Sequence, residues 1–102
     1  MAGSRKEMEF REDFKVHPDH VIIGDPVHND ICIIVQKGTW KGREKVHVRG
    51  LYRDDNTQKW CPGKGAAFSP DFAADVIHAL CKQVGIESWE ELMGQSALAE
   101  KT

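Results

Sequence analysis

The sequence lacks a long hydrophobic run, an even set of cysteines and a recognisable catalytic motif. No apolar segment approaches the ~18 residues that a membrane-spanning helix needs. The charged start of the chain, residues 1–7, has no apolar stretch of the kind that a signal segment contains. We therefore expect no membrane association. The expected location is cytoplasmic or nucleoid-associated in a bacterium or phage, and nuclear in a eukaryote.

Cysteine is scarce, and its spacing does not suggest pairing. The three cysteines are Cys32, Cys61 and Cys81. An odd number at wide spacing argues against a disulfide framework and favours a reducing compartment. Two pairs have the spacing of zinc ligands, His17 with His20 and His78 with Cys81. A zinc module needs two such pairs at a matching separation, which the sequence does not supply, so no metal and no other cofactor is predicted.

The usual signatures of catalysis are also missing. The sequence contains no HExxH, GxSxG or P-loop pattern. Asp54 and Asp55 are adjacent turn residues and not a positioned carboxylate pair. Cys61 lies between the basic residues Lys59 and Lys64, but no orienting acid accompanies it. We therefore expect a protein that is not an enzyme.

Basic charge is concentrated in one part of the chain. The length of 102 residues indicates one domain, and 40% hydrophobic with 29% charged residues is a globular composition. The formal net charge is only -2, yet residues 37–64 contain eight basic and three acidic side chains. We call residues 37–64 the basic block. Such a block attracts polyanions whatever the net charge of the protein, although solvated surfaces also contain blocks of this kind.

Hydrophobic patterning predicts about four antiparallel strands. They are expected at residues 21–23, 31–35, 45–49, and, around a Pro-Gly kink, at 58–61 and 66–68. A polar hairpin connection is expected over residues 36–44. Alternation in residues 45–49 places Val46 and Val48 on one face of the sheet, which we expect to be the core face that the helix covers. The other face receives the basic side chains Lys45, His47 and Arg49.

A helix is predicted to follow the strands. Ser69, Pro70 and Asp71 form a typical helix start, and an apolar stripe follows at helical spacing. The stripe consists of Phe72, Ala73, Val76, Ile77, Leu80 and Val84. Gly85 is expected to end this helix, and Ser88 is expected to cap a short second helix.

These patterns predict an α+β fold, a four-stranded antiparallel sheet followed by a C-terminal helix. Residues 1–19 are expected to form a flexible N-terminal arm, residues 20–94 the domain and residues 95–102 a loose tail. One helix covers four strands poorly, so we expect two chains to pair as a homodimer.

The basic block interleaves cations with large aromatic rings. Its candidate binding residues are Lys37, Trp40, Lys41, Arg43, Lys45, Arg49, Tyr52, Trp60 and Lys64. Cations neutralise phosphates, and exposed rings stack on unpaired bases, which a duplex hides. This combination points to a single strand. For Trp60, a place in the core is an equally good interpretation, whereas Trp40 lies in a glycine-flanked polar segment and is expected to be exposed.

The order of these segments resembles the positive cofactor four family of transcriptional coactivators and its bacterial single-stranded-DNA-binding relatives. The matching segments are residues 21–24, 31–35, 40–43, 46–49, 62–65 and 69–70. The resemblance implies a dimer of curved sheets that binds single-stranded DNA with little sequence preference. It implies that the hairpin of Trp40, Lys41 and Arg43 meets DNA. It further implies that Arg49 binds phosphate, that Tyr52 is a stacking ring and that Lys64 is a basic contact.

Two features depart from the family pattern. Only one basic residue follows the Pro-Gly pair, and Gly50, Leu51 and Tyr52 follow Arg49 where an acidic residue and paired rings are usual. Simple alternation also places Tyr52 and Arg49 on opposite faces of a strand. They share a groove only if the strand bulges or twists, and Gly50 is the expected position for this irregularity.

Two other partners remain open at this point. The apolar helix and the acidic C-terminal part are suited to docking a polymerase or replication protein. RNA is the nearest alternative ligand, because a flat stacking surface does not read the 2′-OH. The function that the sequence favours is non-enzymatic, largely sequence-independent binding of single-stranded DNA during transcription, replication or repair.

Overall fold

The computed structural model describes residues 8–98. The chain divides into two compact units, residues 1–70 with the sheet and residues 71–102 with the helices. Of the predicted arm and tail, residues 1–7 and 99–102 lie outside the described residues. Across the described part, no helix combines the length and the apolar character needed to cross a membrane.

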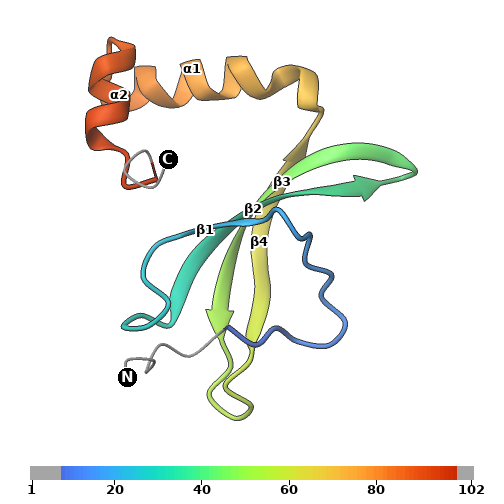
Figure 1. Ribbon diagram of the computed structural model, residues 1–102. Coiled ribbons are helices and arrows are strands. Elements are labelled where there is room, and N and C mark those ends of the chain that lie inside the picture. The colour runs from blue at the N-terminus through green and yellow to red at the C-terminus, as the bar shows by residue number, and fades with distance from the viewer. Residues whose placement is uncertain (1–7, 99–102) are drawn as a thin grey trace. The chain divides into compact units, whose positions relative to one another are not determined.

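The first unit is a four-stranded antiparallel sheet in which sequential strands are neighbours (Figure 1). The strands are β1 Val21–Ile23, β2 Ile31–Trp40, β3 Arg43–Arg53 and β4 Trp60–Phe68. Together with the helices that follow, this arrangement confirms the predicted α+β fold class. The two predicted strands around the Pro-Gly pair are one continuous strand, β4.

The hairpin between β2 and β3 is tighter than the predicted connection over residues 36–44. Only Lys41 and Gly42 form the turn, and both have positive φ angles, 53° and 76°. A two-residue turn of this kind matches the right-handed twist of the strands that it joins. Polar composition suggested a loop here, but β2 extends through these residues as a paired strand to Trp40.

The pairing of β2 with β3 is unbroken and defines two faces of the sheet, since partners in register share a face. One face is the side against which the N-terminal segment, residues 8–19, packs, and we call it the arm face. It carries Cys32, Ile34, Gln36 and Trp40 of β2 with Arg43, Lys45, His47, Arg49 and Leu51 of β3. The other, which we call the valine face, carries Ile31, Ile33, Val35 and Lys37 of β2 with Val46, Val48 and Tyr52 of β3. The predicted separation of the valines from the basic residues of β3 is confirmed.

The buried core of this unit lies on the arm face. Its cluster consists of Cys32, Ile34, Leu51 and Trp60, with Met8, Phe10, Phe14, Val16 and Ile22 packed against it. The arm face therefore changes character along its length, from apolar near Leu51 to basic near Arg43. The sequence predicted the apolar core on the opposite face, because alternation was read only over residues 45–49 and Leu51 lies just beyond them.

Residues 8–19, for which the sequence predicted a flexible arm, contact the sheet. Phe10 forms a parallel bridge with Trp60. The backbone oxygen of Glu9 accepts a hydrogen bond from the Trp60 amide at 2.7 Å, and the Arg11 amide donates to the Trp60 oxygen at 2.9 Å. The apolar side chains of this segment bury core surface, which holds it against the sheet. We call residues 8–19 the arm.

The pairing of β3 with β4 is irregular beside Gly50. Arg49 pairs with Gly65 and Leu51 pairs with Pro62, so Gly50 alone faces two residues of β4, Gly63 and Lys64. An irregularity was predicted at Gly50. The extra residue lies in β4, however, so the alternation of side chains along β3 is unchanged. A Cβ atom on Gly65 would lie 2.3 Å from the Val48 carbonyl oxygen. Glycine at position 65 therefore allows β4 to approach β3 beside Arg49.

The second unit contains two helices. A 3-10 turn at Pro70–Phe72 leads into α1, Ala73–Val84, and α2 spans Trp89–Gln95. Gly85 ends α1 in the left-handed conformation, with φ at 79°, and the Glu91 amide donates to the Ser88 hydroxyl at 3.1 Å. The predicted end of the first helix at Gly85 and the predicted Ser88 cap are confirmed. The predicted start at Pro70 opens the 3-10 turn, and α1 itself begins only at Ala73. Neither helix has a buried residue.

Candidate nucleic-acid interface

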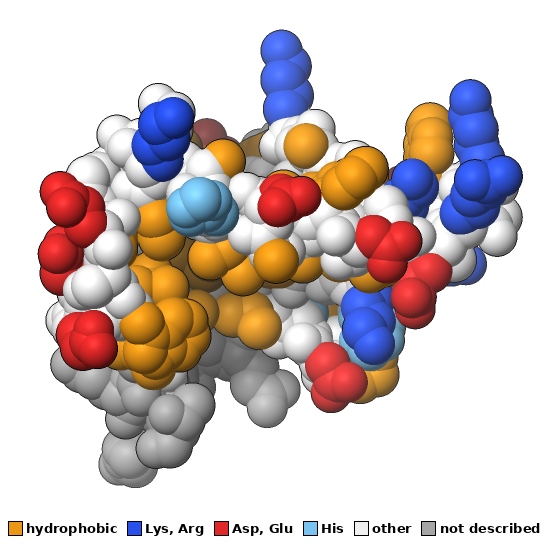
Figure 2. Space-filling view, turned by 90° about the horizontal axis from the view of Figure 1, so that it is seen from above, with side chains coloured by type: hydrophobic (Ala, Val, Ile, Leu, Met, Phe, Trp, Pro, Cys, Tyr) orange, Lys and Arg blue, Asp and Glu red, His pale blue; other side chains and the backbone are white. Residues whose placement is uncertain are grey.

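The tip of the β2–β3 hairpin combines an exposed ring with cations. Trp40 is 59% exposed, and the Lys41 Nζ atom lies 5.9 Å from the centre of its ring. Arg43 is the register partner of Trp40, so both extend from the arm face. Figure 2 shows Lys and Arg side chains gathered over this end of the sheet. The hairpin therefore presents a ring and several positive charges to solvent.

The eight cations of the basic block fall into two groups. Arg53 donates to Asp30 at 3.0 Å and to the backbone oxygens of Pro26 and Asn29 at 3.1 Å. Lys59 donates to Glu12 at 3.2 Å. Both cations are thus occupied by contacts within the chain. Within residues 8–98, no ion pair or side-chain hydrogen bond occupies Lys37, Lys41, Arg43, Lys45, Arg49 or Lys64.

Three of the unoccupied cations form a row on the arm face. Arg43, Lys45 and Arg49 follow β3 at alternate positions, with His47 between the last two. Alternate residues of a strand are roughly 7 Å apart. A Cβ atom on Gly38 would lie 2.7 Å from the His47 ring. The bare backbone of Gly38 therefore leaves room for the imidazole of His47 above β2.

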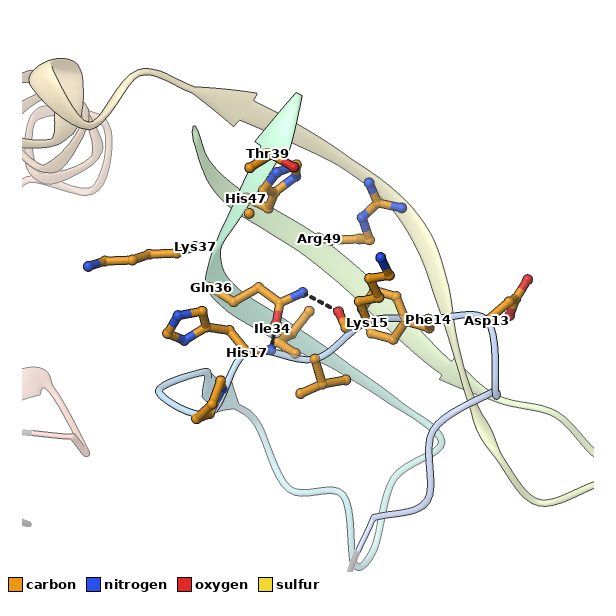
Figure 3. A pocket seen from close by; sticks show the side chains of 13 residues that line it. Asp13, Phe14, Lys15, His17, Ile34, Gln36, Lys37, Thr39, His47 and Arg49 are labelled. Carbon is orange, nitrogen blue, oxygen red and sulfur yellow. Dashed lines mark hydrogen bonds between the residues drawn. The ribbon is translucent and has the colours of Figure 1, made fainter. Parts of the chain in front are cut away.

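A groove lies where this row meets the arm (Figure 3). Gln36 holds the arm across β2, because its Oε1 accepts a hydrogen bond from the His17 amide at 2.8 Å and its Nε2 donates to the Lys15 oxygen at 3.1 Å. The groove has a volume of about 540 Å³, and arm residues 13–18 line one wall. Ile34, Gln36, His47 and Arg49 line the sheet side.

Among the described residues, one carboxylate lines this groove, and it is already paired. Asp13 accepts a hydrogen bond from Arg11, and this bond holds the pKa of the Asp13 carboxyl below its usual value. The Asp13 carboxylate thus stays ionised and is paired with the Arg11 guanidinium. Lys15, Lys37 and Arg49 remain as the unpaired charges of the groove among the described residues.

Two predicted binding residues do not join this surface, and Trp60 is the clearer case. Trp60 is 2% exposed and belongs to the core. The Arg53 guanidinium lies 5.0 Å from the centre of its ring. A base cannot reach this ring in the folded chain, which decides between the two interpretations of Trp60 in favour of the core.

Tyr52 is the second case. It is 45% exposed, but it points to the valine face and its register partner is Ile31. The unbroken β2–β3 register keeps it on the opposite face from Arg49. Lys37 belongs to the valine face by its register with Val46, but it also lines the groove. Lys64 is exposed in β4, at the irregularity beside Gly50.

The described residues contain no group of three or more His, Cys, Asp and Glu side chains that could hold a metal ion. Burial raises the pKa of the Cys32 thiol. Cys61 is also buried, and its thiol donates to the Lys59 oxygen at 3.7 Å.

Nothing in the sequence indicated that the arm borders the basic surface. The only available signal was the pair of aromatic residues Phe10 and Phe14 in a charged segment, which here pack at 5.9 Å between ring centres. Nothing in the spacing of Lys15 or Gln36 showed that they would meet, since 21 residues separate them. No protein-family model, curated protein or solved structure gives a significant match to the chain.

Proposed function

We propose that this protein is a non-enzymatic, largely sequence-independent single-strand-binding protein, with DNA as its ligand. The observation that supports this function best is the division of the basic block. Two of its cations are occupied by contacts within the chain, while the row Arg43, Lys45 and Arg49 and the hairpin residue Lys41 are unoccupied beside the exposed Trp40. Unoccupied cations beside an open ring match a phosphate backbone with unpaired bases.

The chemistry of the surface favours a single strand over a duplex. Trp40 offers its ring to solvent at the hairpin tip, and a base in a duplex has no free face to stack on it. Phosphates alone would be bound by the cations in either form of DNA. We therefore expect the preference for a single strand over a duplex to depend on the Trp40 ring. Arg43 is expected to bind the phosphate next to the stacked base.

Homodimer formation is part of this proposal. The valine face exposes apolar side chains, with Ile31 at 73%. The 3-10 turn exposes Phe72, and α1 exposes Ile77, Leu80 and Val84. Apolar surface of this extent favours burial by a second copy of the chain. We expect twice the chain mass in multi-angle light scattering at micromolar concentration. A monomer mass across the concentration range would contradict the dimer without affecting the strand-binding proposal.

A titration of fluorescently labelled oligo-dT of about 20 nucleotides, alone and annealed to its complement, tests the binding function. If about five phosphates are neutralised, the slope of log affinity against log salt is expected near -3 to -4 on the single strand. Binding to the duplex should be weaker at every salt concentration. Equal and weak binding to both forms would contradict the proposal and leave the alternative, a module that docks a protein partner.

The choice between DNA and RNA is tested in the same assay. Unlabelled oligo-dT and oligo-rU of equal length compete for the labelled strand. We propose DNA as the ligand, so oligo-dT should compete at least as well as oligo-rU. Clearly stronger competition by oligo-rU would show that RNA and not DNA is the ligand. The proposal that bases stack on this surface would still hold.

A further inference from the structure

The arm divides the arm face of the sheet into a covered part and an open part. Gln36 bonds the backbone of the arm on both sides of Val16, at Lys15 and His17. The arm thereby crosses β2 beside Ile34 and Gln36 (Figure 3). A nucleic-acid strand that follows the cations from Arg43 toward Arg49 meets the arm at this point.

The groove at this point offers positive charge from two separate segments. Lys15 comes from the arm and Arg49 from β3, and both line the same groove. No partner among residues 8–98 neutralises either of them. The nearby Asp13 is engaged by Arg11. Unpaired cations from two segments that line one groove favour the binding of an anion there.

The remainder of the groove is suited to a ring. Phe14 and Val16 contribute apolar surface, and the His47 imidazole lies over the bare backbone of Gly38. The volume of about 540 Å³ lies within the range of about 300–1,000 Å³ that is usual for small-molecule sites. The groove thus combines anion-binding and ring-binding surface at the scale of one nucleotide.

We propose that the groove between the arm and the sheet is a nucleotide subsite. Lys15 and Arg49 contact the phosphate, the His47 ring supports the base, and Gln36 positions the arm as the wall of the site. The subsite rests on the proposed function and extends it, because it makes the arm a part of the strand-binding surface. The nucleotide unit comes either from a single strand or from a free nucleotide, and the two sources are separated experimentally.

Chemical-shift mapping on the full chain tests the position of the subsite. The probes are a six-residue oligo-dT and thymidine monophosphate, each titrated into ¹⁵N-labelled protein. We expect oligo-dT to shift the backbone amides of Lys15, His17, His47 and Arg49. Shifts with the oligonucleotide alone assign the subsite to a polynucleotide, and shifts with both probes assign it to a nucleotide from either source. Shifts confined to residues 40–45 with both probes would overturn the subsite.

Affinity measurements test the roles of the side chains. Lys15→Ala should weaken oligo-dT binding about fivefold and make the salt slope shallower by about 0.7, the expected change for one phosphate contact on a single strand. The control is Lys82→Ala, which removes an exposed lysine from α1. It should change neither quantity. An unchanged slope in Lys15→Ala would show that Lys15 does not contact a phosphate.

The contact of His47 with Gly38 allows a sharper test. An added methyl group at Gly38 would meet the His47 ring at 2.7 Å, so Gly38→Ala should displace the ring and weaken binding as His47→Ala does. In the double variant Gly38→Ala/His47→Ala no ring remains to be displaced. Its affinity should therefore equal that of His47→Ala and not the sum of both losses.

The failure of the subsite is distinguishable from the failure of the proposed function. If Lys15→Ala and His47→Ala bind oligo-dT as the natural sequence does while Trp40→Ala binds weakly, the subsite is wrong and strand binding stands. If the natural sequence binds no single strand, both the subsite and the proposed function are contradicted. Thermal melting of each variant shows whether a loss of affinity has its origin in a loss of folded protein.

Discussion

Replacing Trp40 with alanine is expected to weaken oligo-dT binding by roughly 5- to 150-fold. Stacking of a base on an aromatic side chain contributes about 1–3 kcal/mol, and each 1.4 kcal/mol is a factor of ten in affinity. Trp40 is 59% exposed, so the free energy of unfolding should change by no more than about 0.5 kcal/mol. Fluorescence anisotropy measures the affinity, and urea denaturation measures the stability.

The chain contains a matched control for this substitution. Trp89 is 67% exposed and lies at the start of α2, outside the unit that contains the hairpin. Trp89→Ala should leave oligo-dT binding unchanged. Equal losses in the two variants would indicate a general effect on the protein, and no loss in Trp40→Ala would remove the ring from the proposed interface.

Replacing Trp60 with alanine is expected to act on stability. The ring is 2% exposed, and Phe10 of the arm is bridged to its backbone. Truncation of a buried tryptophan typically costs about 3–5 kcal/mol through lost burial and the cavity that remains. That is a large part of the total stability of a small domain. We expect a large fall in the urea midpoint, or an unfolded protein by circular dichroism.

Trp60→Phe keeps the prediction testable if the alanine variant does not fold. A phenylalanine retains most of the ring contact and should lower the stability by less, while oligo-dT affinity should stay within about twofold of the natural sequence, a change of less than about 0.5 kcal/mol. A loss of affinity at unchanged stability would show that a base reaches Trp60, contrary to its place in the core. The two tryptophans of the basic block are thus expected to have different roles. Replacing Trp40 should affect binding, and replacing Trp60 should affect folding.

Local patterns predicted the elements of the fold well. Alternation of valines with basic residues in β3 survives in the structure because the β2–β3 register is unbroken through Tyr52. Gly85 and Ser88 act as helix boundaries because capping depends on a few neighbouring residues. The bulge beside Gly50 was placed at the correct level, although the extra residue belongs to β4.

Features that depend on contacts between distant segments could not be predicted from the sequence. The burial of Trp60 requires the arm, which is separated from it by about 50 residues. The occupied state of Arg53 requires Asp30 and the backbone near Pro26. No local pattern in the basic block distinguishes Arg53, which is occupied by contacts within the chain, from Arg49, which is free for a ligand. Only the tertiary contacts make that distinction.

The bridge between Phe10 and Trp60 has a consequence for the order of folding. The β2–β3 hairpin closes through a two-residue turn, so it forms early and at small entropic cost. The arm docks only after residue 60 has joined the sheet, which makes it a late and separable step. Native-state hydrogen exchange should therefore find the arm amides opening at lower free energy than those of the hairpin. Each such opening exposes the core and dismantles one wall of the groove, so that a ligand held there would slow the release of the arm.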